Sequence, residues 1–204
     1  MNRSDSGLTR RQAVSKLFAA AAAVCLGLPR VSFAEGPALD HDGRVNPSRP
    51  VPDIPVRTAD GASTSLAALL RGHSTALHLV FTECTTTCPI QGAVFQRVQR
   101  LMHDQIEHRI QLLSLSIDPA TDTPESLKKW LDRFHARPGW IAALPRAEDV
   151  AALRTFFNEG ARAISNHSTQ VQIVNPRAEL IWRTQELPSS DSIVAILGKM
   201  SASR

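Results

Sequence analysis

Residues 81–90 read FTECTTTCPI, and this stretch decides how the chain is interpreted. Two of the three cysteines, Cys84 and Cys88, lie four positions apart, with three threonines between them and Pro89 directly after. Such a pair can form a disulfide, act as a redox pair or hold a metal ion between two thiolates. A disulfide here would close a very short loop, and a disulfide stabilises a fold least in that case. The spacing therefore favours a chemical role over a purely stabilising one.

The residues around this stretch predict an α/β fold. An apolar run at 75–81 predicts a buried strand before the cysteines, and apolar residues at helical spacing over 91–108 predict a helix after them. Further strands are expected at 110–117, 140–144, 171–174 and 180–182, and further helices at 124–135, 147–158 and 190–199. Asp60-Gly61 predicts the turn of a small hairpin near the start of the domain. Together these elements predict a mixed central sheet flanked by helices, with an added N-terminal hairpin.

This arrangement brings the cysteines to the carboxyl end of a buried strand. Functional sites of α/β sheets are commonly built at that edge. The N-terminus of the following helix offers unpaired N–H groups and positive potential, which favour the thiolate form of a cysteine. The thiolate is the form that binds metals and performs redox chemistry, so both readings of the pair stay open.

Residues 1–34 predict an export signal. Arg10-Arg11 precede an apolar run from Leu17 to Leu28, and Ser32-Phe33-Ala34 has the small-x-small pattern of a signal peptidase site. The paired arginines resemble a twin-arginine (Tat) signal, with an ordinary Sec signal as the alternative. The apolar run is shorter than the ~20 residues that span a bilayer. We therefore expect a soluble periplasmic protein after cleavage, or a membrane-anchored one if the signal is retained.

Removal of that segment changes the charge and the cysteine count. Residues 1–34 hold Cys25, five basic residues and one acidic residue, of the 23 basic and 19 acidic residues in the chain. Eighteen residues of each sign then remain, so the charge gives no indication of nucleic acid binding. The proline-rich residues 35–50 predict an extended linker, and the folded domain is expected to span residues 51–204.

A third ligand would separate a metal site from a redox pair. Of the seven histidines, His78 lies inside the predicted buried strand and is expected to be a core residue. His167 lies in a polar turn, Ser165 to Thr169, directly before a predicted strand, where it can come close to the cysteines. Two thiolates and one imidazole suit copper as Cu(I) and Cu(II). Structural zinc sites normally use four protein ligands, and the sequence offers no convincing fourth.

The chain resembles the Sco/SenC family, the copper-binding assembly proteins of cytochrome c oxidase. Four stretches carry the resemblance, which covers about residues 50–200: FTECTTTCPI at 81–90, LLSLSIDPATDTPESLKKW at 112–130, NHSTQVQIVNP at 166–176 and PDIPVRTADGASTSLAALLRG at 52–72. The resemblance implies a thioredoxin-like fold that holds copper through Cys84, Cys88 and His167. The chain departs from the family pattern at Asn166, where the family often has Asp. It also departs at residues 177–179, which lack the usual turn glycine.

Two aspartates of the second stretch match the family pattern, and we expect structural roles for both. Asp118 is expected to form a turn near the site, and Asp122 is expected to accept hydrogen bonds at the start of a helix.

The resemblance implies a copper-delivery protein of the bacterial cell envelope rather than an enzyme. Its partners would be a cytochrome c oxidase subunit or another copper-site protein, and other copper chaperones or thiol–disulfide oxidoreductases; we expect a monomer. The alternative is a thiol–disulfide reductase, in which Cys84 and Cys88 are the catalytic redox pair and keep a partner's copper-site cysteines reduced. A peroxidase is disfavoured, because the chain lacks an arginine-backed Thr-x-x-Cys pocket.

Overall fold

The structure is a computed structural model that describes residues 43–106, 108–158 and 169–201. The chain divides into two units, residues 1–36 and 37–204, and every described residue belongs to the second unit. The predicted export signal at 1–34 therefore lies outside the described residues. Within the part of the chain that the structure describes, no helix is both long and apolar enough to cross a bilayer.

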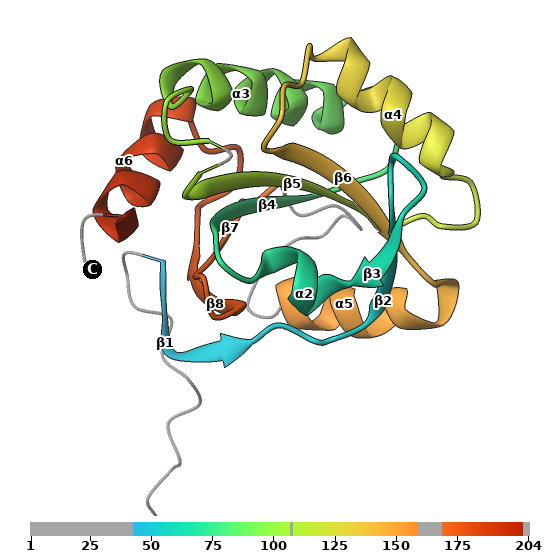
Figure 1. Ribbon diagram of the computed structural model, residues 1–204, viewed down its shortest axis with the longest axis horizontal. Coiled ribbons are helices and arrows are strands. Elements are labelled where there is room, and N and C mark those ends of the chain that lie inside the picture. Colours follow the sequence, from blue (N-terminus) through green and yellow to red (C-terminus); the bar gives the residue numbers. More distant parts are fainter. Residues whose placement is uncertain (1–42, 107, 159–168, 202–204) are drawn as a thin grey trace, which may run out of the picture. The chain divides into compact units, whose positions relative to one another are not determined.

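A mixed eight-stranded sheet forms the centre of the described unit (Figure 1). The strands are β1 (Arg44–Pro50), β2 (Pro55–Thr58), β3 (Ser63–Ser65), β4 (Ser74–Val80), β5 (Ile110–Ser116), β6 (Trp140–Pro145), β7 (Gln172–Val174) and β8 (Glu179–Arg183). Their order across the sheet is β1-β8-β7-β4-β5-β6-β2-β3. The three central strands β4, β5 and β6 run parallel, and the outer strands pair antiparallel. The mixed sheet confirms the fold class predicted from the sequence.

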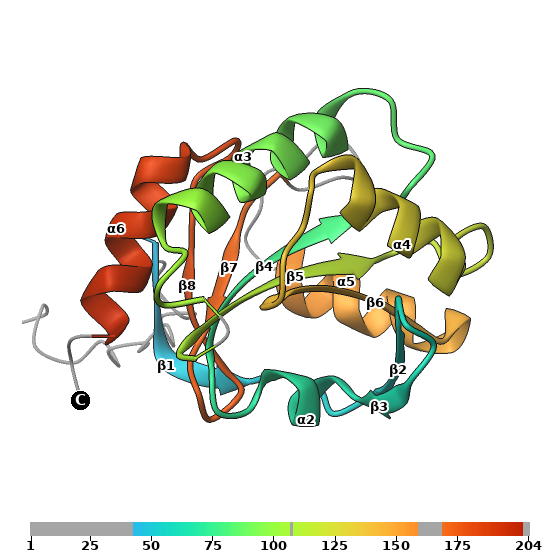
Figure 2. The same cartoon turned by 45° about the horizontal axis from the view of Figure 1, so that its top comes forward.

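Helices cover both faces of this sheet. They are α2 (Leu66–Leu70), α3 (Thr87–Leu101), α4 (Pro124–Arg133), α5 (Val150–Asn158) and α6 (Ser190–Ser201), with a short 3-10 turn at Ala147–Asp149. Helices α3 and α4 lie on one face, with α6 beside α3, whereas α2 and α5 lie on the other face (Figures 1 and 2). Because both faces are covered, every residue of β4 and β5 is buried.

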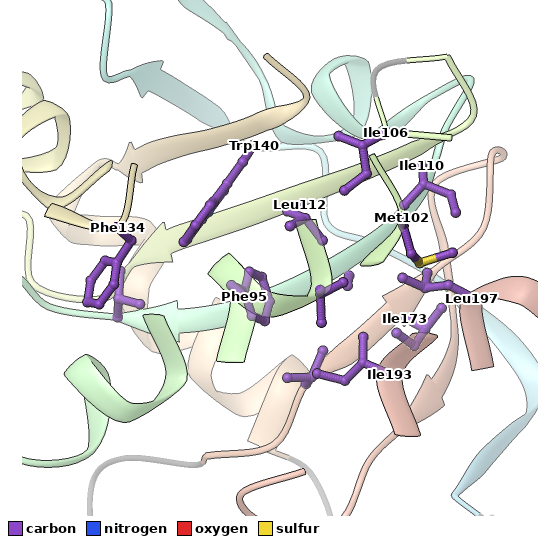
Figure 3. Packing of buried hydrophobic residues seen from close by; sticks show 14 of the residues in the cluster. Phe95, Met102, Ile106, Ile110, Leu112, Phe134, Trp140, Ile173, Ile193 and Leu197 are labelled. Atoms are coloured by element: carbon purple, nitrogen blue, oxygen red, sulfur yellow. The ribbon is translucent and has the colours of Figure 1, made fainter. Parts of the chain in front are cut away.

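The alternation of side chains along β4 separates two hydrophobic cores. Ala76 and Val80 face the core under α3, α4 and α6, whereas Leu77 and Leu79 face the core under α2 and α5. Figure 3 shows the first core, in which Phe95 of α3 lies between an aromatic group and the aliphatic side chains of β7 and α6. This core also contains both cysteines of the FTECTTTCPI stretch, so the cysteines are anchored in the buried core under α3, α4 and α6.

The predicted N-terminal hairpin is present as β2 and β3. Gly61 has a positive φ of 86° at its turn, where Asp60 accepts hydrogen bonds from the Thr58 hydroxyl and from the Ala62 N–H. The hairpin extends the sheet through β2, which pairs with β6.

The prediction of an extended linker over residues 35–50 is wrong for its second half, which is a strand. Residues Arg44–Pro50 form β1, which pairs antiparallel with β8 at the edge of the sheet. An edge strand needs only one row of N–H donors, so it accepts Pro47 and Pro50, which in a central strand would break the ladder.

The roles expected for the two aspartates are confirmed for one and wrong for the other. The Asp118 carbonyl accepts hydrogen bonds from Thr121 N–H and Asp122 N–H, so Asp118 does form a turn. Asp122 does not cap α4, because Thr123 holds that position in a capping box with Ser126. The Asp122 carboxylate is buried and points to the cysteine loop instead.

Candidate metal and redox centre

The cysteine loop, residues 81–86, connects the carboxyl end of β4 to the first turn of α3. Cys84 lies in the loop, and Cys88 lies in the first turn of the helix. Helix α3 begins at Thr87, four residues before the predicted start, and Pro89 is accommodated in its first turn, where no intrahelical N–H is required. Both cysteines are free thiols, and their side chains are buried. The expected position at the strand end is therefore confirmed.

Cys84 supplies the acceptor that a capping side chain would normally provide at the start of α3. Thr86, the N-cap residue, makes no capping hydrogen bond, and the first turn contains no acidic residue. The Cys88 N–H instead donates to Cys84 Sγ, with a nitrogen–sulfur distance of 3.4 Å. The Thr86 and Thr87 hydroxyls also lie 3.8 Å from this sulfur. The helix N-terminus is therefore directed at Cys84, which favours the thiolate.

These contacts give the two thiols opposite pKa shifts. Burial opposes ionisation of Cys84, but hydrogen bonds from the Cys88 N–H, the Cys88 thiol, the Thr86 backbone and the Thr87 hydroxyl outweigh it and lower the pKa of Cys84 to about 6. Burial raises the pKa of Cys88 to about 12, and the neighbouring Cys84 adds to that shift. At neutral pH the pair therefore carries one thiolate, on Cys84, and one thiol, on Cys88.

His167, the third predicted ligand, lies outside the described residues. The described chain resumes at Thr169, two residues later. Gln91 Nε2 donates to the Thr169 carbonyl oxygen at 2.9 Å, and Gln91 lies in α3 three residues after Cys88. Two residues of chain span at most about 7 Å, and three residues of helix rise about 4.5 Å. Thr169, two residues after His167, is thus hydrogen-bonded to the helix that carries Cys88.

Glu186 fixes Thr169 from the opposite side. Its carboxylate accepts hydrogen bonds from the Thr169 N–H, at 2.6 Å, and from the Thr169 hydroxyl. The Thr169 hydroxyl in turn accepts from the Leu187 N–H at 3.0 Å. Sequence reasoning missed Gln91 and Glu186. Gln91 carries a signal that could have been found, because it is a polar residue on the helical stripe shared by the buried Cys88 and Phe95.

His78 is a core histidine, as predicted, and does not contribute to the site. It is completely buried and stacks on Phe95 with ring centroids 3.9 Å apart. Burial lowers the pKa of His78 to about 3, so its ring is neutral. His78 Nε2 lies 2.6 Å from Ser114 Oγ, which also accepts hydrogen bonds from the indole N–H groups of Trp130 and Trp140. Because Ser114 Oγ already accepts twice, its own hydrogen is directed to His78 Nε2.

No group of three or more His, Cys, Asp or Glu side chains that could hold a metal ion occurs within residues 43–106, 108–158 and 169–201. The described residues do bring together two sulfur ligands of the expected soft type, one of them a thiolate at neutral pH. This dithiol fits either a soft metal ion or thiol–disulfide exchange, and the third ligand would have to come from outside the described residues.

The fold and the dithiol define a thioredoxin-like protein whose two cysteines are separated by three residues at the start of a helix. The SCO1/SenC family profile matches residues 58–202, and the chain belongs to that family. The fold is shared with yeast Sco1 solved with copper bound, at a TM-score of 0.64 and 15% identity, over 76% of this chain and 90% of that one. It is also shared with BsSco, a member of the Sco family of cytochrome c oxidase assembly proteins in which a disulfide switch was identified. That match has a TM-score of 0.63 and 21% identity, over 77% of this chain and 96% of BsSco.

A similar sequence is the SCO2-like protein of Rickettsia prowazekii, 30% identical over 70 residues. The similar stretch covers 33% of this chain and 33% of that protein, so the chain matches about a third of the length of this relative.

Proposed function

We propose that this chain is a copper-binding metallochaperone that delivers copper during cytochrome c oxidase assembly, and that Cys84, Cys88 and His167 hold the metal. Membership of the SCO1/SenC family supports the proposal, as does the copper bound by yeast Sco1. The chain carries one thiolate at neutral pH, and copper binding would displace the proton of the second thiol.

One hydrogen bond supports the assignment of His167 as the third ligand. The hydrogen bond from Gln91 to the Thr169 carbonyl attaches the residue two positions after His167 to the helix of Cys88. Copper accepts thiolate and imidazole ligands, and the imidazole matters more for Cu(II) than for Cu(I). The metal would pass to a partner by ligand exchange, in which thiolates or thioethers of the partner replace the imidazole or a thiolate in turn.

Copper titration of the full, reduced chain tests this proposal. We expect one copper ion per chain, and we expect His167→Ala to weaken Cu(II) binding strongly and Cu(I) binding less. His103→Ala is the matched control, since His103 is an exposed histidine paired with Asp104. Unchanged Cu(II) affinity in the His167 variant would remove His167 from the site, and binding lost equally in the control would exclude a specific ligand role.

The place of action is part of the same proposal. Residues 1–34 would direct export by the Tat route, and the protein would act as a monomer in the periplasm. Its partners would be a cytochrome c oxidase subunit or another copper-site protein, together with other copper chaperones or thiol–disulfide oxidoreductases. Export is tested by fractionating cells that express the chain with Arg10 and Arg11 replaced by lysine. Retention of only this variant inside the cell supports the Tat route, and normal export of the variant contradicts it.

The second candidate is a thiol–disulfide reductase, which the unequal pKa values of the two cysteines favour. The Cys84 thiolate would attack a partner disulfide, releasing one partner thiolate, and Cys88 would then resolve the mixed disulfide as the second partner thiolate leaves. Cys88→Ser should therefore accumulate a mixed disulfide with a disulfide-containing peptide, whereas Cys84→Ser should not. Accumulation with neither variant would argue against the reductase.

A further inference from the structure

Asp122 makes a set of buried hydrogen bonds that connects the cysteine loop to the neighbouring strand. Its carboxylate is only 3% exposed, and Oδ1 accepts from the Thr82 N–H at 3.0 Å and from the Thr82 hydroxyl at 2.6 Å. Oδ2 accepts from the hydroxyl of Ser116, the last residue of β5, at 2.6 Å. Ser116 Oγ in turn accepts from the Asp118 N–H at 3.1 Å. One carboxylate therefore holds three donors from two strand ends.

These bonds fix the start of the loop that presents Cys84. Thr82 lies two residues after the end of β4 and two residues before Cys84. Next to it, the Cys84 N–H donates to the Phe81 carbonyl at 3.2 Å, and the Ile117 N–H donates to the Val80 carbonyl at 2.9 Å. The other end of the loop is fixed by α3 itself, where the Cys88 N–H donates to Cys84 Sγ. With the Thr82 end released, the loop that carries Cys84 would lose its anchor to the end of β5.

The formation of α4 does not explain why a carboxylate is buried here. Thr123 and Ser126 already satisfy the start of that helix. Burying a carboxylate is costly unless donors satisfy it, and here most of the donor groups belong to the cysteine loop. A carboxylate at this position is therefore explained by what it does for the loop.

We propose that Asp122 is a positioning residue of the cysteine site, which holds Cys84 over the first turn of α3 through Thr82. This inference rests on the proposed function, because the position of Cys84 affects activity only if its sulfur binds a metal or exchanges disulfides. Loss of a residue that orients a metal ligand typically lowers metal affinity 10- to 100-fold. We expect an effect of this size on Cu(I) binding, and we expect the backbone N–H groups of Thr82 and Cys84 to exchange their hydrogen with solvent faster, since the bonds that order this end of the loop are lost.

The test compares the full, reduced chain with its Asp122→Asn and Thr82→Val variants. Asn keeps the volume of Asp122 but replaces one acceptor oxygen by a donor facing Ser116, and Val removes only the Thr82 hydroxyl. Thr123→Ala is the matched control, since it removes the α4 cap at the adjacent residue without contacting the loop. Cu(I) affinity is measured by competition with a chromophoric chelator, the order of the cysteine loop by hydrogen exchange of the Thr82 and Cys84 N–H groups, and folding by circular dichroism.

We expect Asp122→Asn to lower Cu(I) affinity at least tenfold, Thr82→Val to lower it by less, and Thr123→Ala to leave it within twofold while lowering the melting temperature. Asp122→Asn and Thr82→Val combined should lose less than the sum of their separate effects, because both weaken the same set of hydrogen bonds around residue 122. A folded Asp122→Asn protein with wild-type affinity and wild-type hydrogen exchange at Thr82 and Cys84 overturns the inference. If Asp122→Asn does not fold, wild-type values in Thr82→Val overturn it. If the wild-type chain binds no copper, the proposed function fails, and hydrogen exchange of the loop still decides whether Asp122 positions Cys84.

Discussion

The fold lowers the pKa of Cys84 and so makes it the more reactive of the two thiols. Its lowered pKa of about 6 lies below, and the raised pKa of about 12 for Cys88 lies above, the ordinary thiol value of about 8.5. A group with a lowered pKa stabilises the fold above its unfolded pKa and loses that contribution as the pH falls through its folded pKa. The contribution of Cys84 should therefore be complete above about pH 8.5 and should be lost as the pH falls from there to about 6. Cys88 has the opposite effect, so stability should decrease as the pH rises above about 8.5.

With Cys25 replaced by serine, absorbance of the thiolate in the reduced, metal-free chain should therefore rise in two separate steps. The first step is expected near pH 6, and the second only in strongly alkaline solution. Cys84→Ser should remove the first step, and this loss would assign the first step to Cys84. A single step of two thiolates near pH 8.5 would show that the helix N-terminus does not act on Cys84.

Helix α3 approaches α4 closely enough that a single added methyl group should disturb the packing. A Cβ atom on Gly92 would lie 2.4 Å from two ring carbons of Phe134. That ring cannot easily yield, because it packs edge-on to Trp130 at 4.8 Å between centroids and against Trp140 at 6.2 Å. We expect Gly92→Ala to lower the free energy of unfolding by about 1–2 kcal/mol, since the overpacking exceeds the gain of about 1 kcal/mol in helix propensity.

Urea unfolding checks this expectation, with Gly198→Ala in α6 as the control. Nothing lies within 4 Å of a Cβ atom built on Gly198, so that substitution should raise stability by up to about 1 kcal/mol. Adding Phe134→Leu to Gly92→Ala should recover part of the loss. Equal stabilisation by both alanines would contradict the close packing of α3 on Phe134.

Most helices and strands were predictable, because each buries apolar residues at the regular spacing of a helix or as a continuous run. The apolar runs at 75–81 and 110–117 became β4 and β5 within one residue at each end. The start of α3 was predicted four residues late, since β-branched threonines and a proline hide a first helical turn that is built around Cys88. Strand β1 was missed for the related reason that its prolines resemble a linker, although an edge position tolerates them.

At the scale of the molecule, the sequence identified the two cysteines of the candidate site but not the contacts that hold them. Cys84 and Cys88 are adjacent along the chain, so their spacing was enough to predict a shared site. The Asp122–Thr82 and Gln91–Thr169 contacts join positions 40 and 78 residues apart, and only the register of β4, β5 and β7 brings them together. The proposed role of His167 depends on the second contact and stays a prediction.

Binding of Cu(I) should be coupled to the stability of the whole fold. A ligand at a hundredfold excess over its Kd stabilises the native state by about 2.7 kcal/mol if it does not bind the unfolded chain. For a chain of this length, that corresponds to a rise in melting temperature of about 5–10 °C. The real rise should be smaller, because the unfolded chain keeps Cys84 and Cys88 four residues apart and also binds Cu(I).

Calorimetry of the reduced chain with and without Cu(I) measures this rise, and a Cu(I) chelator should reverse it. Cys84→Ser should reduce the rise most, since it removes one of the two thiolates that dominate Cu(I) binding. His167→Ala should reduce it less, because an imidazole from a distant segment joins the two sulfurs only in the folded chain. An undiminished rise in Cys84→Ser would place the bound ion elsewhere, and a rise unaffected by His167→Ala would mean that the dithiol alone holds Cu(I).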